Sequence, residues 1–135
     1  MNNEFADPRD IPVITCALSI SFLDEVSAKD FAIEVETLTG SIPRTYRPKI
    51  NDVWIVEAAV IHNERFWHLN EALLKLFDSI CTIKNQLNDA IKKHRGTVTM
   101  DIAVYETEGY PALYLSNKVV NDICFFSASI GIDLV

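Results

Sequence analysis

The chain has 135 residues, which suits one domain and leaves no room for a second independent core. Hydrophobic residues make up 49% and charged residues 23%, a balance that excludes a disordered polypeptide. The net charge of −7 argues against nucleic acid as the main partner, because phosphate binding needs a concentrated positive field.

Residues 1–12 are predicted to form a loose lead-in, polar and acidic, and we expect no secretory signal in it. No apolar run approaches the roughly 20 residues of a membrane helix, so no membrane span is expected. The cysteines Cys16, Cys81 and Cys124 are odd in number and lie among apolar neighbours. They are predicted to be reduced, buried thiols, and the protein is predicted to be cytoplasmic.

Two elements are predicted before residue 41. Residues 14–22 alternate between apolar and small polar side chains, which is typical of a half-buried strand. Ser27 is predicted to cap the following helix, which keeps apolar residues on one face. Gly40 is its predicted stop signal.

The next predicted elements are a loop, a strand and a long helix. Two prolines mark 41–52 as a loop, and DVWIVEAAV at 52–60 follows as a strand with Trp54 and Glu57 on opposite sides. Helical spacing of apolar residues then extends over about 64–95. Thr82 is a potential break, so one helix or two consecutive helices fit this pattern.

Alternation returns at 97–104, which predicts a third strand, and ETEG at 106–109 is a predicted turn. Residues 110–116 are predicted to form a fourth strand at a sheet edge, because Pro111 cannot donate to a ladder.

A short helix and a closing strand complete the prediction. Ser116 or Asn117 is the expected cap of the helix, and its expected inner face includes Val120, Ile123 and Cys124. Residues 130–134 form the closing strand. The order of elements predicts an α+β fold with a single layer of antiparallel or mixed sheet, about five strands, and helices packed on one face.

The sequence contains no recognisable catalytic or cofactor motif. Its four glycines form no phosphate-binding loop, and no serine lies in a nucleophile elbow. We therefore expect no catalytic residue and no cofactor. Glu64, His68 and Glu71 have helical spacing that suits metal ligands, but an exposed pair in a first helical turn is the simpler interpretation.

Three acids lie within apolar strand patterns: Glu57, Asp101 and Asp133. If they share one open sheet face, they form an acidic patch or a shallow site. The alternative is that each simply points outward into water. Similarly, RTYRPK at 44–49 is either a small anion-binding patch or a solvated loop.

One arrangement of short motifs covers residues 13–135 and resembles the domain of unknown function family numbered 4279. Members share a helix-ending glycine followed by a proline-threonine turn, a tryptophan opening the second strand, a late Leu-Ser helix cap and an Ile-Asp ending. The corresponding residues here are Gly40, Pro43, Thr45, Trp54, Leu115, Ser116, Ile132 and Asp133. Family members often have Gly-Asp before the tryptophan strand, where this chain has Asn51 and Asp52.

The resemblance implies a compact α+β fold without established catalytic residues. Small acidic domains of this kind are also similar to immunity proteins, which neutralise toxins delivered between bacteria. The leading hypothesis is therefore an acidic protein-binding module, an immunity protein that blocks a basic toxin domain. The residues expected to meet the partner are Asp101, Tyr105, Glu106, Glu108, Tyr110 and Tyr114.

Three other hypotheses stay open. A small-molecule or regulatory domain would have a pocket that includes Trp54, Glu57 and His68. An enzyme would use a carboxylate or histidine from Glu57, Asp101 or His68. The positive mean hydropathy of +0.12 is consistent either with a homodimer interface or with a well-filled core.

Overall fold

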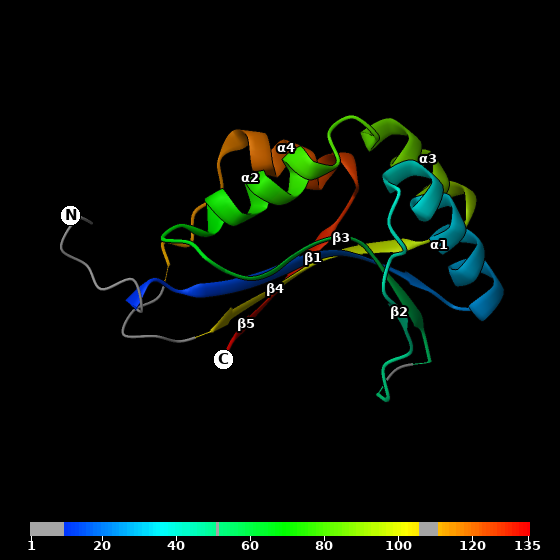
Figure 1. The fold of residues 1–135 in the computed structure, drawn as a ribbon, viewed down its shortest axis with the longest axis horizontal. Helices are drawn as coiled ribbons and strands as arrows, with labels where there is room; N and C mark the ends of the chain where they lie inside the picture. The colour runs from blue at the N-terminus through cyan, green and yellow to red at the C-terminus, as the bar shows by residue number, and fades with distance from the viewer. Residues whose placement is uncertain (1–9, 51, 106–110) are drawn as a thin grey trace.

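The computed structural model describes residues 10–50, 52–105 and 111–135. These residues form one sheet of five strands, in the order β2-β3-β1-β4-β5, and four helices. All four helices lie on one face of the sheet, and no helix of the described residues lies on the other face (Figure 1). The prediction of an α+β fold with a single sheet and helices on one face is confirmed, and the sheet is mixed.

The elements have the following bounds in chain order: β1 (Val13–Phe22), α1 (Glu25–Thr39), β2 (Thr45–Tyr46), β3 (Trp54–Arg65), α2 (Leu69–Ser79), α3 (Lys84–Lys93), β4 (Thr97–Tyr105), α4 (Asn117–Phe125) and β5 (Ser129–Leu134).

The central strand β1 organises the core. It pairs antiparallel with β3 on one side and with β4 on the other. Every second side chain points toward the helices and is buried, as the alternating pattern predicts. These inward side chains are Ile14, Cys16, Leu18, Ile20 and Phe22. Above them the helices contribute Phe31, Leu73, Leu76 and Leu87, all fully buried.

The helices form two pairs above the sheet: α1 packs beside α3, and α2 beside α4 (Figure 1). Helix α4 carries the chain from β4 to β5, which run parallel, so this crossover makes the sheet mixed.

The long helical pattern divides into two helices and begins later than predicted. Helix α2 ends at Ser79 and α3 starts at Lys84, which places the break next to Thr82. Glu64 belongs to β3, where it pairs with Ile14. The ladder with β1 continues past a bulge at Asn63, whose φ is 49°, so backbone pairing there prevails over helical side-chain spacing.

The cap of α1 differs from the prediction. Asp24 is the N-cap, and its carboxylate accepts hydrogen bonds from the Ser27 backbone N–H at 2.8 Å and from the Ser27 hydroxyl at 2.9 Å. An aspartate satisfies a free N–H at a helix start as well as a serine does. The N-cap therefore lies three residues before the predicted one. Gly40 ends the helix as predicted, with φ of 77°.

In α4 the predicted cap is confirmed, but of the predicted inner face only Ile123 is buried. Ser116 accepts a hydrogen bond from the Val119 N–H, whereas Val120 and Cys124 are exposed. The buried residues are Val119, Asp122 and Ile123. Asp122 is tolerated inside because the Lys84 ammonium lies 2.7 Å from its carboxylate. The pairing cation comes from another helix, which the local pattern does not reveal.

Two further expectations are wrong. Cys81 and Cys124 are exposed, and only Cys16 is buried, where desolvation raises its pKa to about 12. The predicted strand at 110–116 is absent from its described part, residues 111–116, which makes a single bridge between Ala112 and His68. Pro111 has no N–H to donate, and the segment leads to α4 on the helix side of the sheet rather than along an edge.

Glu34 connects α1 to the end of α3 and makes stability depend on pH. Burial opposes its charge, but hydrogen bonds from His94 and from the Lys93 ammonium, at 3.1 Å, outweigh this and hold the pKa of Glu34 below its ordinary 4.5. A depressed native pKa gives stability that is present above pH 4.5 and lost as pH falls through the native pKa.

We therefore predict that Glu34→Gln makes the loss of unfolding free energy below pH 4.5 shallower than in the wild type. Urea unfolding at a series of acidic pH values measures this slope. Glu36→Gln, on the same helix, is the control and should keep the wild-type slope. Identical slopes for Glu34→Gln and the wild type would contradict the assignment.

Candidate functional site

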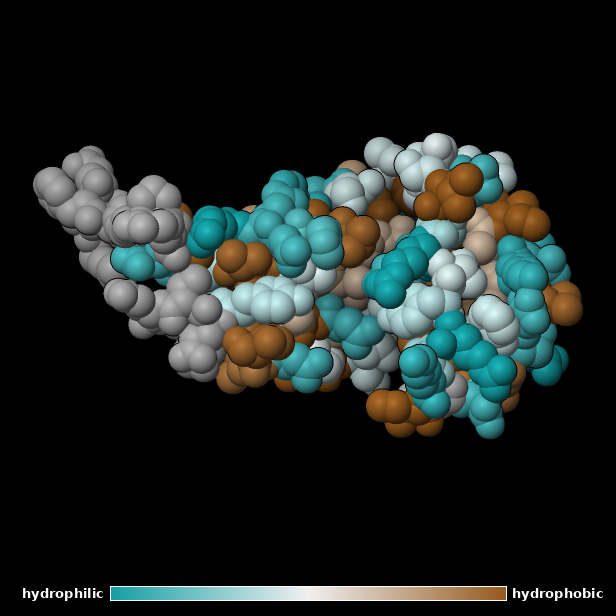
Figure 2. Space-filling model, turned by 60° about the horizontal axis from the view of Figure 1, so that its bottom comes forward, coloured by the Kyte–Doolittle hydropathy of each residue, from teal (hydrophilic) through white to brown (hydrophobic). Residues whose placement is uncertain are grey.

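The uncovered face of the sheet has small side chains along its centre. The outward residues of β1 are Thr15, Ala17, Ser19 and Ser21. On β3 the paired residues Val60, Glu57 and Ile55 are larger, whereas β4 contributes the small residues Thr97, Thr99 and Ala103 together with Asp101. Figure 2 brings this face forward, and it mixes hydrophilic and hydrophobic groups instead of presenting one continuous apolar surface.

Strand register brings the three strand acids to this one face. Glu57 of β3 lies opposite Ser19, and Asp101 of β4 lies opposite Ala17. Asp133 of β5 lies opposite Ala103 of β4. Directly paired residues point to the same side of a sheet, so all three carboxylates are on the open face. All three carboxylates point outward, and they also share one face. The two alternatives left by the sequence, a shared acidic patch and outward-pointing acids, therefore both apply.

These acids line a shallow groove with a volume of about 400 Å³. We call it the acidic groove. Its lining residues are Thr15, Ala17, Tyr46, Glu57, Asp101, Ile102, Ala103, Gly131, Ile132 and Asp133. Three of these side chains are acidic and none is basic, so the groove favours a cationic occupant.

Tyr46 closes one side of the acidic groove, held there by the short strand β2. It pairs with Ile55, and the Arg44 guanidinium lies 4.2 Å from the centre of its ring. Arg44 also approaches the Glu57 carboxylate at 3.6 Å. Partial burial, followed by the negative charge of Glu57, raises the pKa of Tyr46; the Arg44 guanidinium opposes this rise, and the charge of Asp101 adds to it.

Ser19 lies in the floor of the open face and is buried. Its hydroxyl has no hydrogen-bond partner among the residues that the structure describes. Buried hydroxyls are normally paired, so this region contains an unused polar group beside the acids.

The predicted partner-binding residues lie in different places. Asp101 and Tyr105 are both on the open face of β4. Tyr114 lies beside the start of α2, with its ring centre 5.8 Å from that of His68. Glu106, Glu108 and Tyr110 lie outside the described residues.

The structure does not bring Trp54, Glu57 and His68 into one pocket. Trp54 points to the helix side and lines a hollow with residues of α1, whereas Glu57 points to the open face. His68 follows the far end of β3, and ten residues of strand at about 3.3 Å each separate that end from the beginning.

The spacing of Glu64, His68 and Glu71 does not place them on one helix. Glu64 is in β3 and pairs with Lys75, and His68 lies 3.8 Å from Glu71 at the start of α2. Within residues 10–50, 52–105 and 111–135, no group of three potential ligands converges on a metal position.

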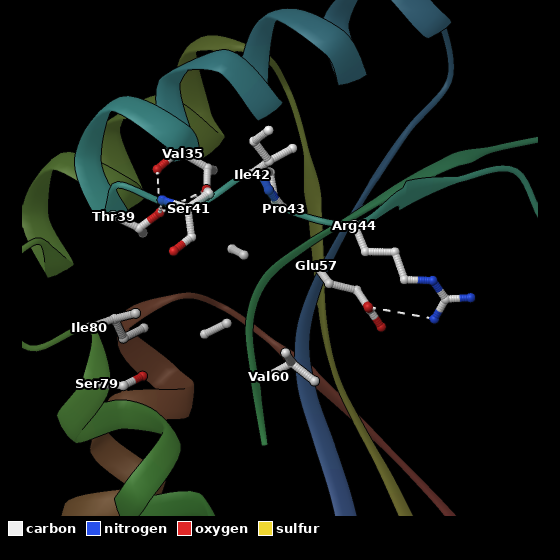
Figure 3. A pocket seen from close by; sticks show the side chains of 12 residues that line it. Val35, Thr39, Ser41, Ile42, Pro43, Arg44, Glu57, Val60, Ser79 and Ile80 are labelled. Carbon is white, nitrogen blue, oxygen red and sulfur yellow. Dashed lines mark hydrogen bonds and ion pairs between the residues drawn. The ribbon is translucent and has the colours of Figure 1, made fainter. Parts of the chain in front are cut away.

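A second hollow, of about 250 Å³, lies at the edge of β3 beside residues 41–44, just before β2 begins (Figure 3). Val35, Ile42 and Ile80 give it an apolar wall. Thr39 and Ser79, two of its hydroxyl side chains, already donate to backbone carbonyls. Arg44 and Glu57 also line it, but their side chains pair with each other at 3.6 Å. The hollow therefore offers little polar chemistry for orienting a ligand.

Sequence reasoning left Tyr46, Arg44 and Asp133 out of the proposed partner-binding residues. Alternation and composition had drawn attention to each of them, but only the pairing of β2 with β3 and of β5 with β4 brings them to the acidic groove.

Comparisons of the chain with protein-family models, with curated proteins and with solved structures found no match. The resemblance to family 4279 stays a prediction. In the part of the chain that the structure describes, no helix combines the length and the apolar character needed to cross a membrane.

The electrostatic coupling around Tyr46 is directly testable. Because Glu57 and Asp101 both raise the pKa of Tyr46, Glu57→Gln and Asp101→Asn should each lower it toward the ordinary 10.0, with the larger effect from Glu57→Gln. NMR titration of labelled tyrosine rings, with Tyr46→Phe to assign the signal, measures this. Asp78→Asn, on the helix layer, is the matched control. An unchanged Tyr46 pKa in both groove variants would contradict the geometry.

Proposed function

We propose that this chain is a protein-binding module whose acidic groove receives a basic segment of a partner protein. In its most specific form, the proposal is an immunity protein that acts in the cytoplasm on a basic toxin domain. The observation that carries it is the convergence of Glu57, Asp101 and Asp133 on the sheet face that no helix of the described residues covers.

The pairing of charges supports this choice of surface. Several acids of the helix layer are neutralised within the chain: Glu34 by Lys93, and Asp78 and Asp122 by Lys118. By contrast, Asp101 and Asp133 make no ion pair with any described residue. Unpaired carboxylates in one groove produce a field that attracts cations and speeds their association.

The shape of the face also suits a protein segment. The small side chains of β1 leave room for an extended chain to lie across the strands. Tyr46 at the groove and Tyr105, which is 40% exposed at the end of β4, are aromatic groups of the kind that anchor interfaces. Arginine side chains would meet carboxylates in the groove and aromatic rings at its side.

The test uses two variants with the same change in net charge. The groove variant replaces Glu57, Asp101 and Asp133 by the corresponding amides, and the control variant does so for Asp30, Glu36 and Asp89, exposed acids of the helix layer. Calorimetry with an arginine-rich peptide measures binding. We expect the groove variant to bind about tenfold or more weakly and the control to stay close to the wild type. Equal losses in both variants would mean that only net charge matters, and would refute the proposal.

The immunity role requires a further experiment in the native host. Tagged wild-type protein and the groove variant are used as baits, and proteins released by high salt are identified. The proposal predicts a basic protein on the wild-type bait only, toxic when expressed alone and harmless when expressed with the wild-type chain. A basic partner without toxicity would keep the binding module and reject the immunity role.

A further inference from the structure

Strand β5 forms one edge of the sheet, and its whole length is exposed. Its apolar residues point to the helix side, because they pair with buried residues of β4, but the helix layer leaves them partly uncovered. Ile130 is 43% exposed, Ile132 44% and Leu134 54%. An apolar strip therefore runs along a strand edge that pairs with no further described strand.

The backbone of these same residues faces away from the sheet. Val135 donates its N–H to the Val104 carbonyl of β4 at 2.8 Å. Successive residues of a strand direct their N–H and C=O groups to opposite edges. By this alternation, Ile130, Ile132 and Leu134 present their backbone groups to the open edge.

The two sheet edges are protected to different degrees. At the other edge, β2 has only two residues and the adjoining β3 contains register irregularities. Bulges and short edge strands are devices that prevent association between sheets. In β5 the pairing from Ser129 to Leu134 is unbroken, with no proline, no lysine and one charged residue, Asp133.

We propose that a second copy of this chain pairs with β5 in antiparallel fashion, about a two-fold axis at Ile132. In this register Ile132 faces Ile132 of the second copy, and Ile130 faces Leu134 of the second copy. All three residues have outward backbone groups, so each forms a hydrogen-bonded pair across the axis. The two sheets join into one, with the apolar strips together on the helix side.

Self-complementarity identifies a second copy of the chain, rather than another protein, as the partner that pairs with β5. The register matches apolar residues with apolar residues and sets Asp133 opposite Gly131 of the second copy, not opposite another carboxylate. Gly131 has no evident role within one chain, since an added Cβ would meet only the Asp101 carboxylate at 3.7 Å, an ordinary contact. The grooves of the two copies become neighbours on one face, so their repulsion predicts tighter pairing at higher salt.

Sedimentation of the full chain over a range of concentrations tests the proposal, with Ile132→Pro and Ile132→Val compared. Proline removes only an outward N–H, so the monomer should fold, whereas the dimer loses bonds on both sides of the axis. We expect Ile132→Val to dimerise like the wild type and Ile132→Pro to dimerise about tenfold or more weakly. Ile130→Lys, which leaves the backbone intact, should weaken the dimer in the same way if Ile132→Pro fails to fold.

Cysteine cross-linking tests the register, with Cys81 and Cys124 replaced by serine. Ile132→Cys should form a disulfide between copies, because a hydrogen-bonded pair has Cα atoms about 5.5 Å apart. Asp133 faces Gly131 of the second copy, so the two Asp133 residues are offset by two positions. Asp133→Cys should therefore form no disulfide between copies. A wild type that stays monomeric up to its solubility limit, or equal cross-linking at both positions, would overturn the proposal. No basic ligand is used, so these outcomes leave the acidic groove untouched.

Discussion

The row of inward side chains on β1 is the interaction on which the rest of the structure depends. Ile14, Leu18 and Ile20 are fully buried beneath both helix pairs, and burying a side chain of this size contributes about 1.5–3 kcal/mol. Because β1 lies at the centre, its registers with β3 and β4 fix which side chains of those two strands point to the helices and which point to the open face. The alternation that builds the core also sends Glu57 and Asp101 to the open face. A slip of one residue would place those carboxylates among the helices.

The sequence predicts most of the fold wherever one local signal is sufficient. The period of two in β1, β4 and β5 and the glycine stop of α1 are signals of this kind. Prediction fails where the structure of a residue depends on a partner that is distant in the sequence. Glu64 joins β3 because Ile14 lies opposite, and Asp122 is buried because Lys84 reaches it from α3. Neither partner is visible within a local window of residues.

The candidate site divides in the same way. Alternation alone indicates that Glu57, Asp101 and Asp133 point outward, but only strand order brings them together. Tyr46 enters through the two-residue strand β2, within a segment that its prolines mark as a loop. The absence of cations beside Asp101 and Asp133, among the described residues, is also a property of the assembled sheet. The two proposals use the two parts of that sheet that the helices leave uncovered, its face and the β5 edge.

The central claim is that the acidic groove, rather than the acidity of the whole chain, receives the basic partner. Amide chemical shifts of the isotope-labelled protein, followed as an arginine-rich peptide is added, test it most directly. The account predicts that shift changes concentrate at Thr15–Ala17, Glu57, Asp101–Ala103 and Gly131–Asp133, with the outer surfaces of α1 and α3 unaffected. Changes centred on the helix layer, or spread evenly over all exposed acids, would contradict it.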